Sequence, residues 1–582
     1  MKQTGQMRFV SRSIERVFTS PADVVVALTP ADVIPCLERV AAAVAQGSYA
    51  AGFITYEAAP AFDPAMRTQP PGDLPLLWFG IYQTMEQGPV VPDKSYTACD
   101  VGPWTPLVSA EEYQHNIQRI REWIAAGDTY QVNYTFPLQA TFQGDALSWF
   151  RRLCAAQQAD YCAYVDLGRH RLLSASPELF FRLKGNTLET SPMKGTRPRG
   201  RWAAEDQEMA HALIASEKDR AENIMIVDLL RNDMSRISEA GSVQVHSLYD
   251  VESFPTVWQM TSTIRSRTRA SVPEIIRALF PCGSVTGAPK IRTMEIIREL
   301  EPHPRGVYCG TIGWWTPDGQ AEFNVAIRTV TIDAQSGQTR YHIGSGITYG
   351  SSAEDEYEEC LIKASLLTRR DPEFELIETL RYDGAYFLLS EHLERLAASA
   401  RYFGFSCDRP AIEKALLAAV GTDPADDRNL RSPTLLKVRL LLRKDGACQI
   451  HREPIASQAT LRVGFAAQPV DASDVFLFHK TTCRAVYRQA LAARPDCDDV
   501  LLWNTRDEIT ESTIANVVLD LDGARWTPPL ASGLLEGTFR RHLLAQGAIA
   551  ERVLTKKDVL RARAIHLINS VRQWIEVNWM DR

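Results

Sequence analysis

Helical and strand-like patterns of apolar residues alternate irregularly between residues 110 and 370. Tyr113, Ile117, Ile120 and Ile124 recur at helical spacing and stop at Gly127, and the next apolar run, 130–136, is typical of a strand. The same patterns predict strands at Tyr161–Leu167, Leu172–Ser174 and Leu179–Leu183, and helices over residues 205–236, 273–280 and 289–300. This mixture predicts an α+β architecture with large β-sheets and flanking helices.

The pattern changes near residue 370. A helical run over 360–370 meets Asp371-Pro372, which cannot continue it, and a strand-like run, Phe374–Arg381, follows. Proline and glycine are also dense over 60–106, which predicts loops that separate an N-terminal subdomain. We therefore expect an N-terminal subdomain over 1–105, a domain over 106–370 and another over 371–582.

Composition narrows the class of protein. A chain of 582 residues with 45% hydrophobic residues is too long for a small binding module. A net charge of -7 argues against binding of nucleic acid, so we expect a small-molecule substrate. The polar start, the lack of an 18-residue apolar stretch and the 11 scattered cysteines without a CxxC pair predict a cytoplasmic protein, neither secreted nor in a membrane.

Glycine-rich segments and carboxylates supply the candidate chemistry of the first 370 residues. Gly283–Lys290 lacks the P-loop ending and Gly344–Gly350 lacks GxGxxG spacing, so both predict backbone N–H groups for an anion such as a carboxylate, or simple turns. Glu356 and Glu359 share a helix face with Lys363 one turn further, a pattern that suits magnesium but would equally complement the helix dipole.

Together these segments resemble the chorismate-utilising enzymes. The resemblance spans roughly residues 110–365 and rests on segments in family order: Ile124–Val132, Ser176–Phe180, Pro192–Thr196, Asp219–Asp233, Gly283–Lys290, Ala326–Arg328 and Gly344–Gly346. Tyr49–Glu57 is also similar to the N-terminal part of such proteins. The resemblance implies a chorismate-binding fold, with chorismate as the substrate.

The resemblance also implies roles for individual residues. Magnesium would lie between a chorismate carboxylate and Glu222 and Glu359, with Glu356 assisting through water. The residues implied in substrate binding are Thr286, Arg328, Gly344, Ser345, Gly346 and Lys363. Glu178 would be the general acid that protonates the departing C4 hydroxyl.

Lys194 separates groups within this family. Anthranilate synthases resemble this motif with alanine at that position, whereas aminodeoxychorismate synthases have a lysine there, which would act as a nucleophile at C2 of the ring. By itself, Lys194 would be an ordinary surface lysine. The chain departs from many relatives at Gln259, where they have histidine.

The last 210 residues resemble a second family, the fold-type IV enzymes that use pyridoxal phosphate. Leu389, Leu393, Leu396 and Ala400 indicate an amphipathic helix, and four landmarks follow in order: Phe478–Thr481, Asp507–Asn516, Thr527–Arg540 and Leu567–Val571. The resemblance implies an α/β domain of two subdomains in which Lys480 binds the cofactor covalently, Arg395, Gly537 and Thr538 hold its phosphate, and Glu511 faces the pyridine nitrogen. A glycine-containing turn and strand that usually precede the segment at Glu378 are missing here.

The two resemblances together imply p-aminobenzoate synthesis, hence a role in folate synthesis. The first part would make aminodeoxychorismate from chorismate and ammonia, and the second would split it into p-aminobenzoate and pyruvate. None of the cysteines lies in a Gly-x-Cys-x-Gly elbow, so a separate amidotransferase subunit would supply the ammonia. The resemblance also allows a homodimer through the second part.

The alternatives keep the fold and change the chemistry. The first part could be an isochorismate-type or anthranilate-type enzyme, with Lys194 as a base that activates water, and the second an aminotransferase. A regulatory subunit without activity is disfavoured by the intact set of Glu178, Lys194, Glu222, Glu359, Lys480 and Glu511.

Overall fold

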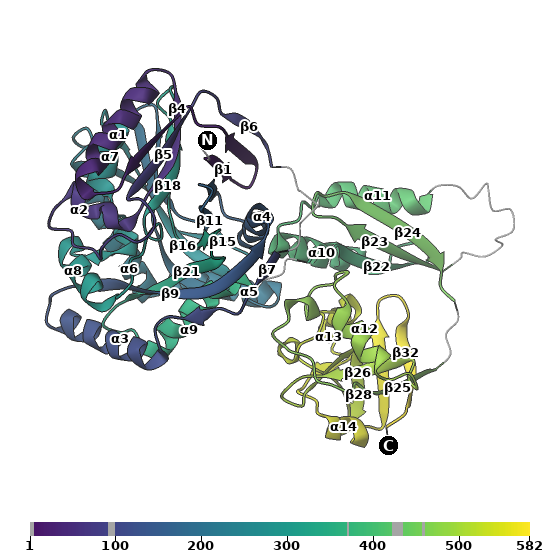
Figure 1. Ribbon diagram of the computed structural model, residues 1–582. Coiled ribbons are helices and arrows are strands. Elements are labelled where there is room, and N and C mark those ends of the chain that lie inside the picture. Colours follow the sequence, from purple (N-terminus) through teal and green to yellow (C-terminus); the bar gives the residue numbers. More distant parts are fainter. Residues whose placement is uncertain (1–4, 91–98, 369–371, 422–434, 457–459, 582) are drawn as a thin grey trace. The chain divides into compact units, whose positions relative to one another are not determined.

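The computed structural model describes residues 5–90, 99–368, 372–421, 435–456 and 460–581 (Figure 1). The chain forms two compact units: residues 1–199 with 209–371, and residues 200–208 with 372–582. The predicted junction at Arg370–Asp371 lies outside the described residues. The predicted mixture of helices with large sheets is confirmed in both units.

The first sheet of the first unit has eleven strands. In spatial order they are β17 (Gly287–Ala288), β9 (Gln131–Gly144), β21 (Gln338–Ile347), β20 (Thr329–Asp333), β11 (His170–Ser176), β10 (Tyr161–Asp166), β1 (Gln6–Val10), β2 (Ile14–Phe18) and β6 (Glu86–Pro89), while β7 (Cys99–Val101) and β8 (Thr105–Pro106) pair with β9. Strands β9 and β21 pair antiparallel from Gln338 opposite Thr141 to Ile347 opposite Val132. This pairing brings Gly344–Gly346 beside the 130–136 run.

The second sheet has ten strands. Their order is β14 (Met193–Pro198), β16 (Val257–Arg267), β13 (Thr187–Ser191), β12 (Leu179–Lys184), β19 (Ala321–Val325), β18 (Thr311–Trp315), β4 (Tyr49–Ile54), β5 (Leu77–Tyr82) and β3 (Asp23–Ala27), and β15 (Gln244–Ser253) pairs with β16. Lys194 therefore lies on the strand that ends this order.

Residues before 106 contribute strands to both sheets. Strand β1 pairs with β10 in the first sheet, and β4 pairs with β18 in the second. The loops predicted over 60–106 are wrong for Leu77–Tyr82, which is a fully buried strand. Its aromatic and β-branched residues favour a strand despite the prolines before it.

Helices flank these sheets. They are α1 (Pro30–Ala45), α2 (Ala59–Phe62), α3 (Ala110–Ala125), α4 (Ala146–Gln157), α6 (Glu217–Ser235), α7 (Val272–Leu279), α8 (Lys290–Leu300) and α9 (Ala353–Ala364), while α5 (Ala203–Ala215) has residues in both units. Helix α1 packs against β3, β4, β5 and α7, as Figure 1 shows. The single helix predicted over 205–236 is wrong, because Ser216 interrupts it: its side chain accepts a hydrogen bond from the Asp219 N–H (3.3 Å) and starts α6.

The second unit has a small and a large sheet. The small sheet is β22 (Leu376–Tyr382), β23 (Leu436–Leu442) and β24 (Cys448–Pro454), next to α10 (Leu389–Phe403) and α11 (Arg409–Gly421). The large sheet is β27 (Ile509–Ser512), β26 (Asp499–Trp503), β25 (Leu461–Phe465), β32 (Gln573–Trp579), β31 (Ala564–Asn569), β28 (Asn516–Leu521), β29 (Ala524–Thr527) and β30 (Ala550–Glu551). Because β27 also pairs with β28, this sheet closes into a barrel-like ring, with α12 (Ala485–Ala492), α13 (Thr538–Ala545) and α14 (Lys556–Arg561) around it.

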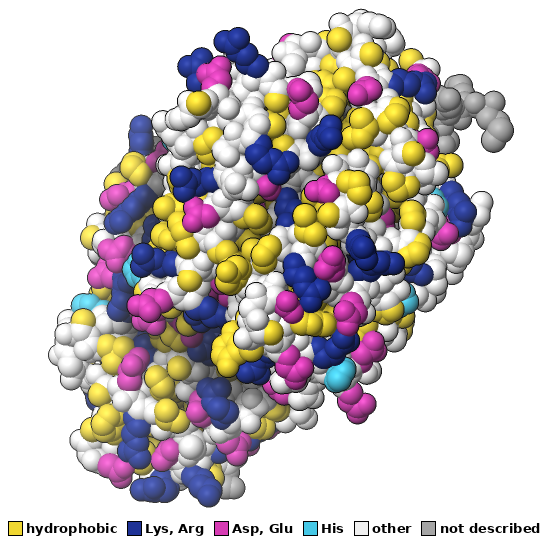
Figure 2. Space-filling model, turned by 90° about the vertical axis from the view of Figure 1, so that its left-hand side faces the viewer, with side chains coloured by type: hydrophobic (Ala, Val, Ile, Leu, Met, Phe, Trp, Pro, Cys, Tyr) yellow, Lys and Arg dark blue, Asp and Glu magenta, His cyan; other side chains and the backbone are white. Residues whose placement is uncertain are grey.

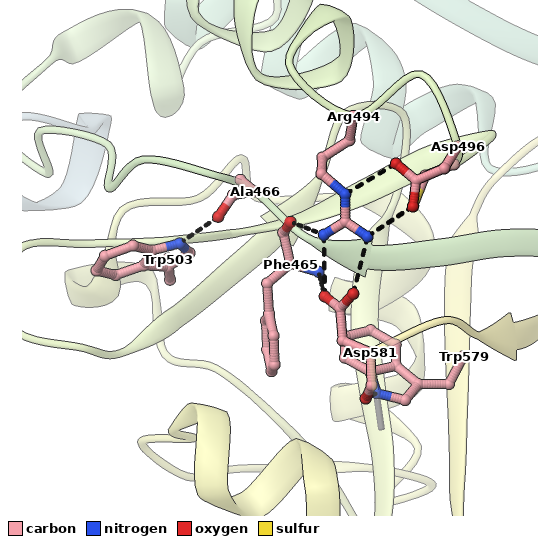
Figure 3. A network of polar contacts seen from close by, with 8 residues as sticks. Phe465, Ala466, Arg494, Asp496, Trp503, Trp579 and Asp581 are labelled. Atoms are coloured by element: carbon pink, nitrogen blue, oxygen red, sulfur yellow. Dashed lines mark hydrogen bonds and ion pairs between the residues drawn. The ribbon is translucent and has the colours of Figure 1, made fainter.

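A network around Arg494 fastens the end of the chain to the large sheet (Figure 3). Its Nη1 and Nη2 donate to the Asp581 carboxylate at 3.1 and 2.8 Å, and Nη1 also donates to the Phe465 carbonyl at 2.9 Å. The Phe465 N–H donates to Asp581 at 2.6 Å, and Asp496 accepts two further bonds from Arg494 at 3.0 Å. The segment after β32 is thereby joined to the end of β25.

Two further properties of the molecule are the distribution of charge on its surface and the apolar length of its helices. On the face drawn in Figure 2, basic and acidic side chains are interspersed with hydrophobic ones. Among the described residues, none of the helices is long and apolar enough to cross a membrane.

We expect Arg494→Met to lower the unfolding midpoint of the second unit by about 3–12 °C, because charged hydrogen bonds contribute roughly 1.5–3 kcal/mol and each kcal/mol shifts the midpoint of a unit of this size by about 2–4 °C. Differential scanning calorimetry would measure the shift. Arg462→Met is the matched control, since the pair of Arg462 with Asp498 has side-chain exposures of 49% and 38% and should contribute little. Equal shifts for the two variants would contradict a special role of the Arg494 network.

Candidate active sites

The first candidate site lies where β9, β14 and β21 approach one another. A Cβ atom on Gly346 would lie 2.0 Å from Nε2 of Gln131 and 3.1 Å from Nζ of Lys194. Any other residue at position 346 would therefore displace one of these side chains. The predicted Gly346 and Lys194, from distant parts of the sequence, meet here.

Lys194 is surrounded by predicted site residues. Burial lowers the pKa of its amine, the carboxylates of Glu222, Glu178 and Glu359 raise it, and the Lys363 charge lowers it, with a net pKa below the usual range. Lys194 is thus a partly desolvated lysine among acids, unlike the surface lysine that its turn alone predicts. A lowered pKa increases the fraction of neutral amine, the form that acts as a nucleophile.

Glu178 lies between β11 and β12 and is 3% exposed. Burial raises its pKa to about 7, although Ser284, the Lys194 charge and the Met193 N–H lower it. Its Oε1 has no hydrogen-bond partner among the described residues. A carboxyl group with this pKa can deliver a proton near neutral pH.

The predicted metal ligands come from α6 and α9. Burial raises the pKa of Glu222, and the charges of Lys194 and Lys218 lower it by less, so the net pKa lies above the usual range. Glu356 is 7% exposed, and Glu359 pairs with Lys363 at 2.7 Å, which holds the pKa of Glu359 below its usual range. Among the described residues, no three His, Cys, Asp or Glu side chains form a preformed metal site. The donors are nevertheless all carboxylate oxygens, which suit magnesium.

The predicted anion-binding residues differ in what they contact. Lys363 Nζ donates to the Gly344 carbonyl at 2.8 Å, and the Ser345 hydroxyl lies 3.4 Å from that of Tyr113. Arg328, in a left-handed conformation (φ 51°), has a pKa lowered by burial. The Thr286 hydroxyl donates within its own loop, to the carbonyls of Cys282 and Gly283 at 3.2 Å. The hydroxyl of Thr286 is thus engaged in holding the loop.

Gln131 is a site residue that sequence reasoning missed. It is 1% exposed, and neither Nε2 nor Oε1 has a hydrogen-bond partner among the described residues. It stands inside the Ile124–Val132 motif, where a polar residue at the start of an apolar strand was the available signal.

The second candidate site surrounds Lys480. Burial lowers the pKa of this lysine to about 8, helped by the Arg395 charge and opposed by Glu378 and Glu511. The backbone carbonyl of Lys480 accepts a hydrogen bond from the Ile377 N–H at 2.8 Å, which fixes the segment beside β22. The predicted Arg395, Lys480 and Glu511 are therefore brought together.

Arg395 on α10 is held by a carboxylate that the sequence did not reveal. Its Nε and Nη2 donate to Glu378 at 2.9 and 2.6 Å, and its Nη1 donates to the Glu536 carbonyl at 3.0 Å, next to Gly537. His392 lies 2.6 Å from the same carboxylate. Burial raises the pKa of Glu378, but Arg395 and His392 lower it by more than burial raises it. The net pKa is about 2. A charged residue in the apolar strand Leu376–Tyr382 was the available signal.

Glu511 lies on β27 in a buried polar setting. It accepts hydrogen bonds from the Tyr487 hydroxyl at 2.8 Å and from Nδ2 of Asn516 at 3.1 Å. Burial raises its pKa to about 7. Asn516 also constrains Gly537, where a Cβ atom would lie 2.0 Å from Oδ1 of Asn516.

These residues fit pyridoxal phosphate. Gly537 precedes α13, whose first residue is Thr538, so backbone N–H groups begin a helix next to the Arg395 guanidinium. Arg395 has five N–H donors, and its bonds to Glu378 and Glu536 leave donors for an anion. Lys480 and the buried carboxylate of Glu511 complete the set of groups that can hold the cofactor.

Two family models match this chain, one over the first part and one over the second. Residues 4–369 match the family model of chorismate binding enzymes, and residues 375–578 match that of amino-transferase class IV. The chain belongs to the chorismate binding enzyme family and continues with a region that matches the model of amino-transferase class IV.

The first part also has characterised relatives. It is 42% identical over 264 residues to aminodeoxychorismate synthase component 1 of Salmonella typhimurium, covering 45% of this chain and 58% of that protein. The same-named Escherichia coli protein is 40% identical over 269 residues, covering 46% and 59%. The chain thus spans less than two thirds of these relatives. Anthranilate synthase component I of Streptococcus pneumoniae has a similar structure, with a TM-score of 0.55 and 25% identity, covering 61% of this chain and 92% of that one.

We expect Glu378→Gln to destabilise the second unit by about 3–5 kcal/mol at pH 7, because it leaves the buried Arg395 charge uncompensated. Urea unfolding of the unit would measure the change.

The pH dependence gives an internal check. With a folded pKa of about 2 and an unfolded pKa of about 4.3, Glu378 stabilises the fold above pH 4.3, and this contribution is lost as pH falls toward 2. Glu378→Gln should reduce the slope of stability against pH in this window. An unchanged slope of stability against pH would contradict the low pKa of Glu378 in the folded unit.

Proposed function

We propose that this chain makes p-aminobenzoate in two reactions. Chorismate and ammonia would give 4-amino-4-deoxychorismate and water, and the second unit would split this product into p-aminobenzoate and pyruvate. The observation that carries the proposal is the half-buried amine of Lys194 beside Gly346, where it and the buried Glu178 act on each other's pKa, in a chain that continues with a class IV region containing Lys480. The names of the relatives support the first reaction.

In the first reaction, Lys194 is the nucleophile and Glu178 the acid. The neutral amine of Lys194 forms a bond to ring carbon C2 as the C4–O bond breaks, and Glu178 protonates the departing hydroxyl to water. Ammonia then bonds to C4 and the C2–N bond to Lys194 breaks. A pKa of about 7 for Glu178 suits this proton transfer at neutral pH.

Chorismate would be held through its two carboxylates. Glu222 and Glu359, assisted by Glu356, would bind magnesium, which supplies positive charge for one carboxylate. Lys363 pairs with Glu359 and also reaches the Gly344 carbonyl, so it can shift its contacts when the ion binds. Arg328, Thr286 and the backbone of Ser345 and Gly346 belong to the proposed anion-binding surface.

In the second reaction, pyridoxal phosphate supplies an electron sink for the carbon that carries the substrate amine. Arg395 and the N–H groups of Gly537 and Thr538 would hold its phosphate. Glu511 would keep the ring nitrogen protonated from its hydrogen-bonded place on β27. Lys480, with a pKa of about 8, can take a proton near neutral pH.

A separate amidotransferase subunit would supply ammonia. The relatives are named component 1, which supports such a partner. A homodimer through the second unit and the domain limits 1–105, 106–370 and 371–582 belong to the same proposal.

One incubation tests the proposal as a whole. The full chain with chorismate, magnesium, ammonium and pyridoxal phosphate should form p-aminobenzoate and equimolar pyruvate, which chromatography measures. Isochorismate or anthranilate as the main product, or amino transfer to a 2-oxo acid, would overturn it in favour of the alternative chemistry.

Lys194→Ala should lower aminodeoxychorismate formation by about 10³-fold or more while chorismate still binds, because the nucleophile is lost and the carboxylate-binding groups remain. Coupled turnover and chorismate binding by calorimetry measure the two effects. Lys184→Ala, at the exposed last residue of β12, is the control. Turnover retained in Lys194→Ala would mean that ammonia attacks chorismate directly.

Lys480→Ala should abolish pyruvate release and the visible or near-ultraviolet absorbance of bound pyridoxal phosphate, while aminodeoxychorismate accumulates. Spectroscopy of the purified chain and product chromatography measure this. Lys557→Ala, in α14, is the control. Pyruvate released at the wild-type rate by Lys480→Ala would contradict the role of this lysine.

A further inference from the structure

Lys194 stands in a β-bulge. On β14, Met193 lies opposite Thr261 of β16, and Thr196 lies opposite Gln259, so the register shifts between these pairs. Lys194 and Gly195 occupy the shifted stretch, and Gly195 has a φ of 92°, a conformation that favours glycine. Bulges of this kind redirect a side chain away from the regular alternation of a strand.

The side chain of Gln259 closes this bulge. Its Nε2 donates to the Gly195 carbonyl at 2.8 Å, and its Oε1 accepts from the Thr196 hydroxyl at 3.1 Å. Gln259 is 7% exposed, so its amide is buried. Both ends of this amide are hydrogen-bonded to the two residues that follow Lys194. Without this amide the half-buried Gly195 carbonyl would lose its partner from Gln259.

Strand β16 also holds the neighbours of Lys194. The Ser262 hydroxyl donates to Oδ1 of Asn223 at 2.6 Å, next to Glu222 on α6. The bulged strand β14 also contacts Glu178, since the Met193 N–H lowers the pKa of this carboxyl group. A displacement of the bulge would therefore move the nucleophile relative to both carboxylates.

We infer that Gln259 is a positioning residue for Lys194: its amide clamps Gly195 and Thr196 and fixes the direction in which the amine points. It acts on the reaction through the bulge, since both ends of its amide are engaged by Gly195 and Thr196. This role rests on the proposed function of Lys194 as the nucleophile.

The test compares Gln259→Met, which keeps size and loses both hydrogen bonds, with Gln259→Glu, which keeps the length and loses the donor. Both should lower kcat for aminodeoxychorismate formation roughly 10- to 100-fold with KM for chorismate within about twofold. Gln259→His should recover part of kcat, because a neutral imidazole has one donor and one acceptor. Gln244→Met, on exposed β15, is the matched control and should match wild type.

A double-mutant cycle separates positioning from general damage to the fold. If Gln259 acts through Lys194, Gln259→Met should cause no further loss in the Lys194→Ala background. Additive losses, a wild-type kcat in Gln259→Met, or a change in KM alone would overturn the inference. Should Gln259→Met fail to fold, Gln259→Glu and Gln259→His carry the same cycle. A wild-type chain that makes no aminodeoxychorismate would instead refute the proposed function.

Discussion

The cost of removing charged groups from water governs both candidate sites. Lys194 is stable inside the first unit because Glu222, Glu178 and Glu359 surround it, and Glu378 is stable inside the second because Arg395 and His392 neutralise it. The same burial makes the groups reactive, since it raises the pKa of Glu178 to about 7 and lowers the pKa of Lys194. Packing and reactivity in each unit are therefore consequences of one electrostatic balance.

That balance depends on strands that place side chains from distant parts of the chain in contact. Gly346 on β21, Lys194 on β14 and Gln131 on β9 share one small volume because glycine leaves room for two long side chains. In the second unit, Asn516 serves both Glu511 and the turn at Gly537, so one amide links the two ends of the proposed cofactor site. Substitutions at these supporting positions would disturb chemistry without removing a reacting group.

Sequence patterns predicted the mixed architecture, and the motifs placed Lys194, Glu178, Lys480 and Glu511 in two clusters. They did not reveal Glu378, Gln131 or the clamp by Gln259, because each contact joins residues far apart in the chain and no local periodicity records it. The loops over 60–106 were mispredicted at Leu77–Tyr82, where long-range pairing with β4 outweighs local turn signals. The break at Ser216 could have been anticipated from its capping hydroxyl, which competes with a continuous helix.

The pairing of early with late strands sets the order in which the first unit can assemble during synthesis. Ile54 of β4 pairs with Thr311 of β18, so the early strand waits for more than 250 residues to be added. At about 5–20 residues per second, this delay is on the order of 13–50 seconds on the ribosome. During that time the apolar pair of β4 and β5 has an unpaired edge at β4, so chaperone binding near the start of the nascent chain would protect it from aggregation.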